Sequence, residues 1–196
     1  MYLITNRHLC SEDRYLEVLK EASYNGVEYI VLREKDLDNR DLINLYFKVK
    51  STINKNTKII INSNLDVYNN VDADGIHLPL EKFMMLKNNK LIRKRGIVGV
   101  STHSLDDIFK LVDSDIDYIF LSHIYETKCK DGLEPKGIDI LKDAKSILKN
   151  TNIKLVALGG ILPSNYIKTM NYCDDVAIMS FIMSSDNVKN AICEFV

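Results

Sequence analysis

Residues 117–121 read Asp-Tyr-Ile-Phe-Leu, a short apolar run that opens with an acid. The same pattern returns at 28–32 (Glu-Tyr-Ile-Val-Leu), 74–78 (Asp-Gly-Ile-His-Leu) and 175–179 (Asp-Val-Ala-Ile-Met). Continuously apolar runs of this length are typical of strands that are covered on both faces, as in parallel sheets. The repeat therefore predicts a sheet built from several similar strands.

Outward from these stretches, short β-branched runs and helical patterns alternate along the whole chain. The runs predict strands at 2–5, 29–33, 58–62, 75–79, 96–101, 118–125, 154–160 and 176–181. Helical or helix-length segments follow at 15–22, 42–53, 65–71, 80–93, 105–112, 140–148, 165–171 and 188–195. Candidate helix starts are Ser11, Asp38, Pro163 and a capping box of Ser104 with Asp107.

Strict alternation of strand and helix predicts a parallel sheet, and eight such units favour closure as a compact (β/α)8 TIM barrel. We expect one domain over residues 1–196. The alternative is a doubly wound open sheet, which normally has five or six strands. A dinucleotide-binding sheet would also need a glycine fingerprint after its first strand, and no glycine occurs before Gly26.

Composition argues for an ordinary globular protein. Of the 196 residues, 46% are hydrophobic and 27% charged, and the formal net charge is -1. This balance argues against disorder and against a nucleic-acid partner. We expect neither a membrane span nor a signal peptide, because no apolar run approaches the required length. The cysteines at positions 10, 129, 173 and 193 lack metal-site spacing, so we expect free thiols and a cytoplasmic protein.

In a TIM barrel, functional groups lie at the carboxyl ends of the strands. Gly159 and Gly160 end the seventh strand and Ser180 the eighth, where barrels often bind phosphate through backbone N–H groups. The alternative for the two glycines is a plain tight turn. Arg33 and Lys35 are separated by one residue at the end of the second strand, so both side chains could point to the same side of the strand. Both could bind an anion there, unless nearby acids neutralise them.

Three histidines stand at predicted strand ends and are candidates for proton transfer. His103 also fits a role at a helix start, and His77, between apolar residues, fits a satisfied core histidine. His123 follows the longest strand run and precedes a polar loop, so its position favours proton transfer most. The chain has no H-E-x-x-H, P-loop or G-x-S-x-G motif and no aspartate pair for magnesium.

Six motifs, in order, resemble the thiamine phosphate synthase superfamily, from residue 1 to about residue 187. They are Leu32-Arg-Glu-Lys35, Gly75-Ile-His-Leu78, Gly99-Val-Ser-Thr-His-Ser104, Asp117-Tyr-Ile119, Leu158-Gly-Gly-Ile161 and Val176-Ala-Ile-Met-Ser180. In the synthase branch, Gln stands at the position of Val31 and magnesium-binding Asp at the positions of Ser63 and Lys82. Loss of both ligands should cripple the displacement of pyrophosphate.

The segment from His123 to Gly137 is instead similar to the thiazole tautomerase branch, the TenI family. The resemblance implies that His123 is general base and acid. The implied substrate is the non-aromatic tautomer of carboxythiazole phosphate in thiamine biosynthesis, and the reaction needs neither cofactor nor metal. The residues expected to bind substrate are Arg33, Lys35, Asn62, His103, Thr127, Lys130, Gly159, Gly160, Met179 and Ser180.

Two alternatives stay open at this point. One is a thiamine phosphate synthase with a drifted sequence, and the other is a catalytically silent TenI-like binding or regulatory protein. The sequence leaves open whether residues 126–135 close over the substrate and whether the chain forms a homodimer, although such barrels commonly pair.

Overall fold

Eight strands, in chain order, form a closed barrel in the computed structural model, which describes residues 1–89, 91, 95–127 and 132–195. The strands are β1 (Tyr2–Ile4), β2 (Tyr29–Leu32), β3 (Lys58–Asn62), β4 (Gly75–Pro79), β5 (Ile97–Thr102), β6 (Tyr118–Ser122), β7 (Lys154–Leu158) and β8 (Asp175–Ile178). The predicted (β/α)8 barrel is confirmed, and the open doubly wound sheet is excluded.

A helix follows each strand. The helices are α1 (Glu12–Tyr24), α2 (Asn39–Thr52), α3 (Leu65–Asn70), α4 (Leu80–Asn88), α5 (Leu105–Phe109), α6 (Asp139–Leu148), α7 (Pro163–Met170), α8 (Ser180–Met183) and α9 (Val188–Cys193), with a 3-10 helix η1 (Arg7–Leu9). All but η1 and α8 overlap segments that the sequence predicts as helical or helix-length. Within the described residues, no helix has the length and apolar composition that crossing a bilayer requires.

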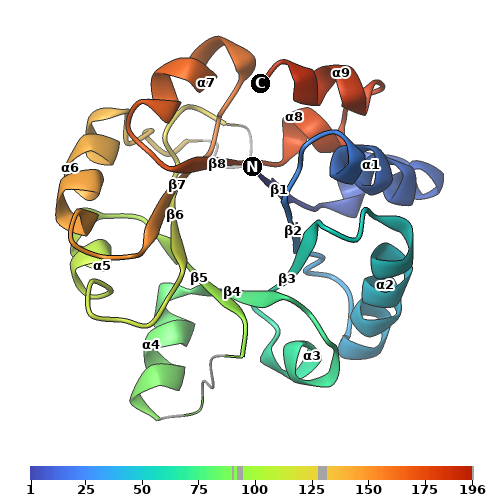
Figure 1. Ribbon diagram of the computed structural model, residues 1–196, viewed down its shortest axis with the longest axis horizontal. Helices are drawn as coiled ribbons and strands as arrows, with labels where there is room; N and C mark the ends of the chain where they lie inside the picture. The colour runs from blue at the N-terminus through green and yellow to red at the C-terminus, as the bar shows by residue number, and fades with distance from the viewer. Residues whose placement is uncertain (90, 92–94, 128–131, 196) are drawn as a thin grey trace. The chain divides into compact units, whose positions relative to one another are not determined.

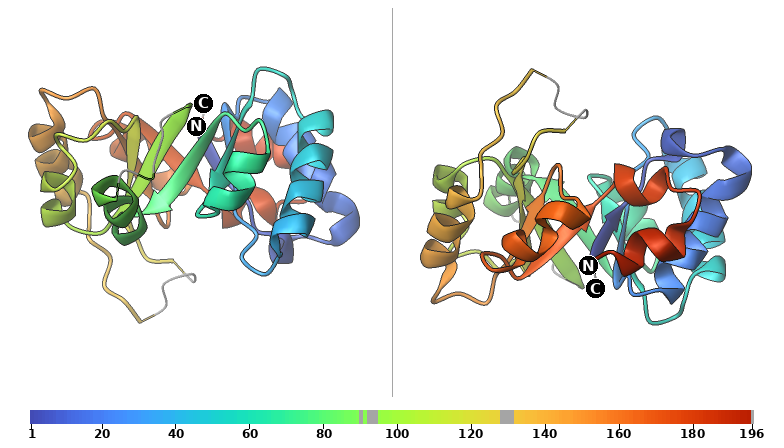
Figure 2. Two further views of the ribbon diagram at one scale, coloured as in Figure 1. Left: turned by 90° about the horizontal axis from the view of Figure 1, so that it is seen from below. Right: turned by 90° about the horizontal axis from the view of Figure 1, so that it is seen from above.

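The chain divides into two compact units, residues 1–76 with 178–196 and residues 77–177. In the first unit, β1 pairs in parallel with β2 and β2 with β3, and α1 and α2 lie on one side of these strands (Figures 1 and 2). In the second unit, β5, β6 and β7 pair in parallel, with α5 and α6 beside them (Figure 1).

The interior of each unit is built by the apolar runs. Ile59, Ile60 and Ile61 of β3 are all buried, and so are Leu155, Val156 and Ala157 of β7. Neighbouring side chains of a strand point to opposite faces, so burial of consecutive residues means that both faces are covered. This is why the strands read as unbroken apolar runs.

The helix starts follow the predictions only in part. Asp38 caps α2, because its Oδ1 accepts a hydrogen bond of 2.8 Å from the Asp41 N–H, and Pro163 begins α7. Ser104 caps α5 through Asp107 N–H, but the Asp107 carboxylate accepts from the N–H of His103, so the predicted capping box is only half formed. Ser11 precedes α1 without any side-chain capping bond.

Five predicted strands run past their observed ends, the first and second by one residue and the sixth, seventh and eighth by two or three. The sixth ends at Ser122 rather than at 125, because His123 and Ile124 use their carbonyls to accept from residues of the following segment. The seventh ends at Leu158, because Gly159 adopts a φ of 98°, which no strand allows. The eighth ends at Ile178, where Ser180 begins the short helix α8, an element that the sequence did not indicate.

Candidate functional site

In the second unit, three candidate segments follow neighbouring parallel strands. His103 directly follows β5, His123 follows β6, and Gly159 follows β7. The register pairs Thr102 with Leu121 and Ser122 with Leu158, so the three strands end at one edge. The structure thus brings these three predicted site positions together.

His123 is buried, with 6% of its surface exposed. Its Nε2 lies 3.2 Å from the main-chain oxygen of Leu133. The segment that carries Leu133 is also attached to the histidine's backbone, since the N–H of Lys136 donates to the His123 carbonyl at 2.9 Å and that of Gly137 to Ile124 at 3.1 Å. The Ser122–His123 peptide bond is cis. The imidazole is therefore held in place by the loop that follows it.

The Leu133 carbonyl decides which nitrogen of His123 carries the proton. A carbonyl oxygen only accepts hydrogen bonds, so Nε2 must be the protonated nitrogen in the neutral ring. Nδ1 then keeps its lone pair and can take a proton from a carbon acid. This arrangement is what a general base requires.

His103 is exposed, and in its ring the other nitrogen, Nδ1, faces a main-chain carbonyl. Its Nδ1 lies 3.1 Å from the main-chain oxygen of Ser122 and 3.2 Å from the Ser122 hydroxyl. The carbonyl again accepts, so Nδ1 is protonated and Nε2 is left for a ligand. At the start of α5 the cap is the Ser104 side chain, and His103 takes part only through its N–H, which donates to the Asp107 carboxylate at 2.8 Å.

His77 is a satisfied core histidine, as the sequence allowed. Its Nδ1 lies 3.0 Å from the Tyr118 hydroxyl and its Nε2 2.7 Å from the Ser101 hydroxyl, and its ring packs against Phe120. Burial lowers the pKa of His77 to about 3. Both ring nitrogens are occupied, so this imidazole has no nitrogen to offer a substrate.

The two glycines after β7 are required by packing. Gly159 and Gly160 have positive φ angles of 98° and 67°, which favour glycine. A Cβ on Gly159 would overlap the Cα and Cβ of His123, and one on Gly160 would overlap Tyr125 and the Glu126 carbonyl. The glycines therefore let the end of β7 lie against the backbone that carries His123, whether or not they also bind phosphate.

In the first unit, Arg33 and Lys35 follow β2 rather than ending it, since the strand stops at Leu32. The alternation expected from a strand therefore does not apply to them. Arg33 is half-buried and Lys35 exposed. Within the described residues, neither side chain has a hydrogen-bond or ion-pair partner.

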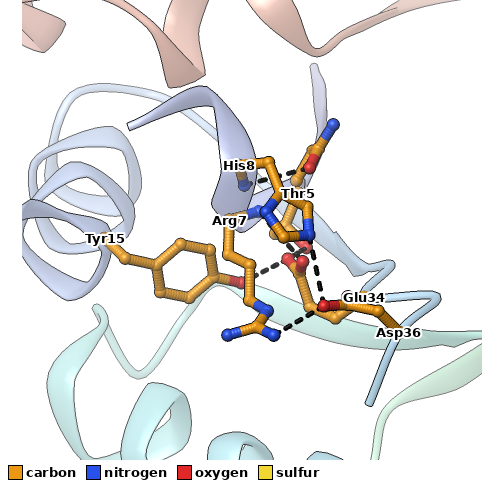
Figure 3. A network of polar contacts seen from close by, with 7 residues as sticks. Thr5, Arg7, His8, Tyr15, Glu34 and Asp36 are labelled. Atoms are coloured by element: carbon orange, nitrogen blue, oxygen red, sulfur yellow. Dashed lines mark hydrogen bonds and ion pairs between the residues drawn. The ribbon is translucent and has the colours of Figure 1, made fainter. Parts of the chain in front are cut away.

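The acids that would neutralise these cations are engaged elsewhere. Glu34 accepts from Thr5, Tyr15 and the N–H of Arg7, as Figure 3 shows. Asp36 binds the side chains of Arg7 and His8, and Asp38 caps α2. Pairing of Arg33 and Lys35 with these acids is therefore not found among the described residues, and binding of an anion by the two cations stays a prediction. Sequence reasoning missed Thr5 and Tyr15, which carry no motif of their own.

Asn62 ends β3, and its side-chain amide donates to the Ser63 hydroxyl at 3.2 Å. The magnesium ion that the synthase branch implies would need oxygen ligands at the positions of Ser63 and Lys82. A serine hydroxyl replaces one carboxylate, and a lysine ammonium has no lone pair to offer a metal. The residues at these two positions do not fit the ion.

The remaining candidates are spread over both units. Met179 precedes α8 and Ser180 begins it, in the first unit. Gly159 and Gly160 belong to the second unit, so a phosphate site shared by the four residues stays a prediction. Thr127 is half-buried in the segment after β6, and Lys130 lies outside the described residues.

Comparison with known proteins gives consistent matches over nearly the whole chain. Residues 1–182 match the model of a family described as thiamine monophosphate synthase. A thiamine-phosphate synthase of Methanobrevibacter smithii is 33% identical over 97% of this chain and 90% of its own length. A thiamine-phosphate synthase of Clostridium tetani is 32% identical over 99% of this chain and 92% of its own length. The solved structure of a Pyrococcus furiosus thiamine phosphate pyrophosphorylase superposes with a TM-score of 0.80 at 24% identity, covering 99% and 92% of the two chains.

Proposed function

Because the chain belongs to the thiamine monophosphate synthase family, we propose that it is an enzyme of thiamine biosynthesis that acts on a phosphorylated thiazole. Full-length relatives at about one-third identity support this proposal. Arg33 and Lys35 would bind an anionic group of the substrate, and Gly159, Gly160, Met179 and Ser180 its phosphate.

Two reactions are candidates. The relatives' names favour a thiamine phosphate synthase, which couples a pyrimidine pyrophosphate with thiazole phosphate. The names support this alternative better than the tautomerase expected from the sequence. The residues at the positions of Ser63 and Lys82, which do not suit magnesium, weigh against it.

The single observation that carries the tautomerase proposal is the buried His123, whose Nε2 is engaged by the Leu133 carbonyl. In the proposed reaction, the C–H bond at ring C2 breaks and its proton passes to Nδ1. The electron pair shifts through the ring, and the exocyclic carbon takes a proton from the imidazolium. The thiazole becomes aromatic, and composition and oxidation state do not change.

The first prediction tests this assignment with two assays on the purified protein. We expect the wild type to isomerise the thiazole tautomer in the presence of a chelator, and His123→Asn to lose about 10²–10⁴-fold in kcat. Binding of inorganic phosphate should survive. The matched control is His103→Asn, which should change KM more than kcat because His103 is assigned to substrate binding.

Coupling of the pyrimidine and thiazole substrates is measured beside this assay, with added magnesium. Coupling without tautomerisation would make the chain a synthase, and full tautomerisation by His123→Asn would exclude this histidine. If a folded preparation catalysed neither reaction, this result would support the non-catalytic alternative.

A further inference from the structure

Glu34 lies between the two cations Arg33 and Lys35, yet it is buried, with 5% of its surface exposed. Its Oε1 accepts from the Thr5 hydroxyl at 2.5 Å and from the Tyr15 hydroxyl at 2.8 Å, and its Oε2 accepts from the N–H of Arg7 at 2.9 Å (Figure 3). These donors come from the residue that follows β1, from α1 and from η1. A buried carboxylate is tolerated only when it is hydrogen-bonded in this way.

The network continues from Glu34 to the backbone of Arg33. The Thr5 hydroxyl has one proton, which it donates to Glu34, and its oxygen accepts from the Arg33 N–H at 2.9 Å. The Thr5 N–H in turn donates to the Val31 carbonyl at 3.0 Å. The carboxylate thus fixes the hydroxyl, and the hydroxyl fixes the amide at which the cationic segment begins.

Asp36 connects the other end of this segment to η1. Its Oδ2 is paired with the Arg7 guanidinium at 2.5 Å and lies 3.2 Å from Nε2 of His8. The hydrogen bond from Arg7 lowers the pKa of Asp36 to about 2. The bonds of Glu34 and Asp36 therefore hold residues 33–36 in place. The side chains of Arg33 and Lys35 have no protein partner among the described residues.

We propose that Glu34 is a positioning residue that holds residues 33–35, through Thr5, in the conformation that presents Arg33 and Lys35 to an anionic group of the substrate. The inference rests on the proposed role of these two cations in substrate binding. Glu34 touches no reacting atom, so its contribution is expressed in substrate affinity and not in the proton-transfer step.

Thr5 and Tyr15 offer a matched pair of variants, which is the second prediction. Thr5→Val and Tyr15→Phe each remove one hydroxyl that donates to the same carboxylate oxygen. Only Thr5 also bonds the amide of Arg33. We expect Thr5→Val to raise KM by about tenfold, the upper end of the effect of one hydrogen bond, with kcat within about twofold. Tyr15→Phe should leave both KM and kcat within about twofold.

Glu34→Gln tests the carboxylate directly. The glutamine amide keeps one acceptor oxygen and places an NH2 group at the other position, where it would face a donor, either the Arg7 N–H or the hydroxyls of Thr5 and Tyr15. We therefore expect a rise in KM. If Glu34→Gln does not fold, the Thr5 and Tyr15 pair decides. Equal changes of KM in that pair, or no change in either variant, would overturn the proposal.

Inorganic pyrophosphate, titrated by calorimetry, separates this inference from the proposed function. Wild type and Tyr15→Phe should bind it with similar Kd, and Thr5→Val and Arg33→Met should bind it about tenfold more weakly or worse. This result would stand even if the wild type catalysed neither reaction. Unchanged binding by Arg33→Met, or no binding by the wild type, would show that the segment holds no anion and would overturn the proposal.

Discussion

Two histidines that follow neighbouring strands are fixed by main-chain carbonyls in opposite tautomers. His123 presents Nε2 to Leu133, and His103 presents Nδ1 to Ser122. Neither carbonyl can donate, so the free nitrogen is Nδ1 in His123 and Nε2 in His103. At the scale of single residues, the chemistry of this site is therefore set by backbone atoms.

The third prediction concerns these tautomers. In protein labelled with 15N-histidine at a pH where the rings are neutral, we expect long-range 1H–15N spectra to show His123 protonated on Nε2 and His103 protonated on Nδ1. His123→Asn and His103→Asn assign the signals. An Nδ1-protonated His123 would contradict the hydrogen bond to Leu133 and would leave Nε2 as the base.

The sequence could identify His123 but not the group that orients it. A histidine before a polar loop is visible in a motif, whereas a main-chain carbonyl has no sequence signature. Pairing of Glu34 with its neighbours, Arg33 and Lys35, was the alternative that the sequence left open. It turns away from them because its partners Thr5 and Tyr15, distant by 29 and 19 positions in the chain, meet it only in the folded protein.

At the scale of elements, two helices with similar predicted starts differ in how they are capped. Asp38 places a carboxylate oxygen 2.8 Å from the N–H of Asp41, whereas Ser11 makes no side-chain capping bond. The first turn of α1 relies on main-chain bonds, such as the one from Arg14 N–H to the Ser11 carbonyl. Residue type alone predicts a cap, but the side-chain conformation decides whether the bond forms.

This difference gives the fourth prediction. Asp38→Ala should lower the free energy of unfolding by about 1 kcal/mol, because the N–H of Asp41 loses its acceptor. Ser11→Ala, its matched control, should lower it by less than about 0.5 kcal/mol, since no capping bond is removed. Urea unfolding measures both. Equal losses would mean that Ser11 caps α1 in solution.

At the scale of the whole molecule, the barrel was predictable because its signal is repeated. Eight apolar runs, each followed by a helical pattern, leave few alternatives, and an error in one run does not change the count. The strand ends were less predictable. Apolar residues continue beyond the last paired residue of β6 and of β8. Composition therefore could not show that a loop begins at His123 or that a helix begins at Ser180.

The fifth prediction concerns the stability of the whole chain in acid, through His77. Burial lowers the pKa of His77 to about 3 in the folded protein, from the ordinary value of 6.5 that it regains on unfolding. Between these values the unfolded chain binds a proton that the folded chain does not. Stability is therefore complete above about pH 6.5 and is lost as the pH falls toward about 3, by at most about 1.4 kcal/mol per pH unit.

His77→Gln removes this titration while keeping groups that can bond Tyr118 and Ser101. We expect the wild type to lose about 2 kcal/mol more than the variant between pH 7 and pH 5, measured by urea unfolding at each pH. Asp36, whose pKa is lowered to about 2, loses its contribution only below its ordinary value of 3.8 and does not disturb this window. Parallel pH profiles of the two proteins would mean that His77 takes up its proton in the folded state as readily as in the unfolded one, and that burial is not what governs it.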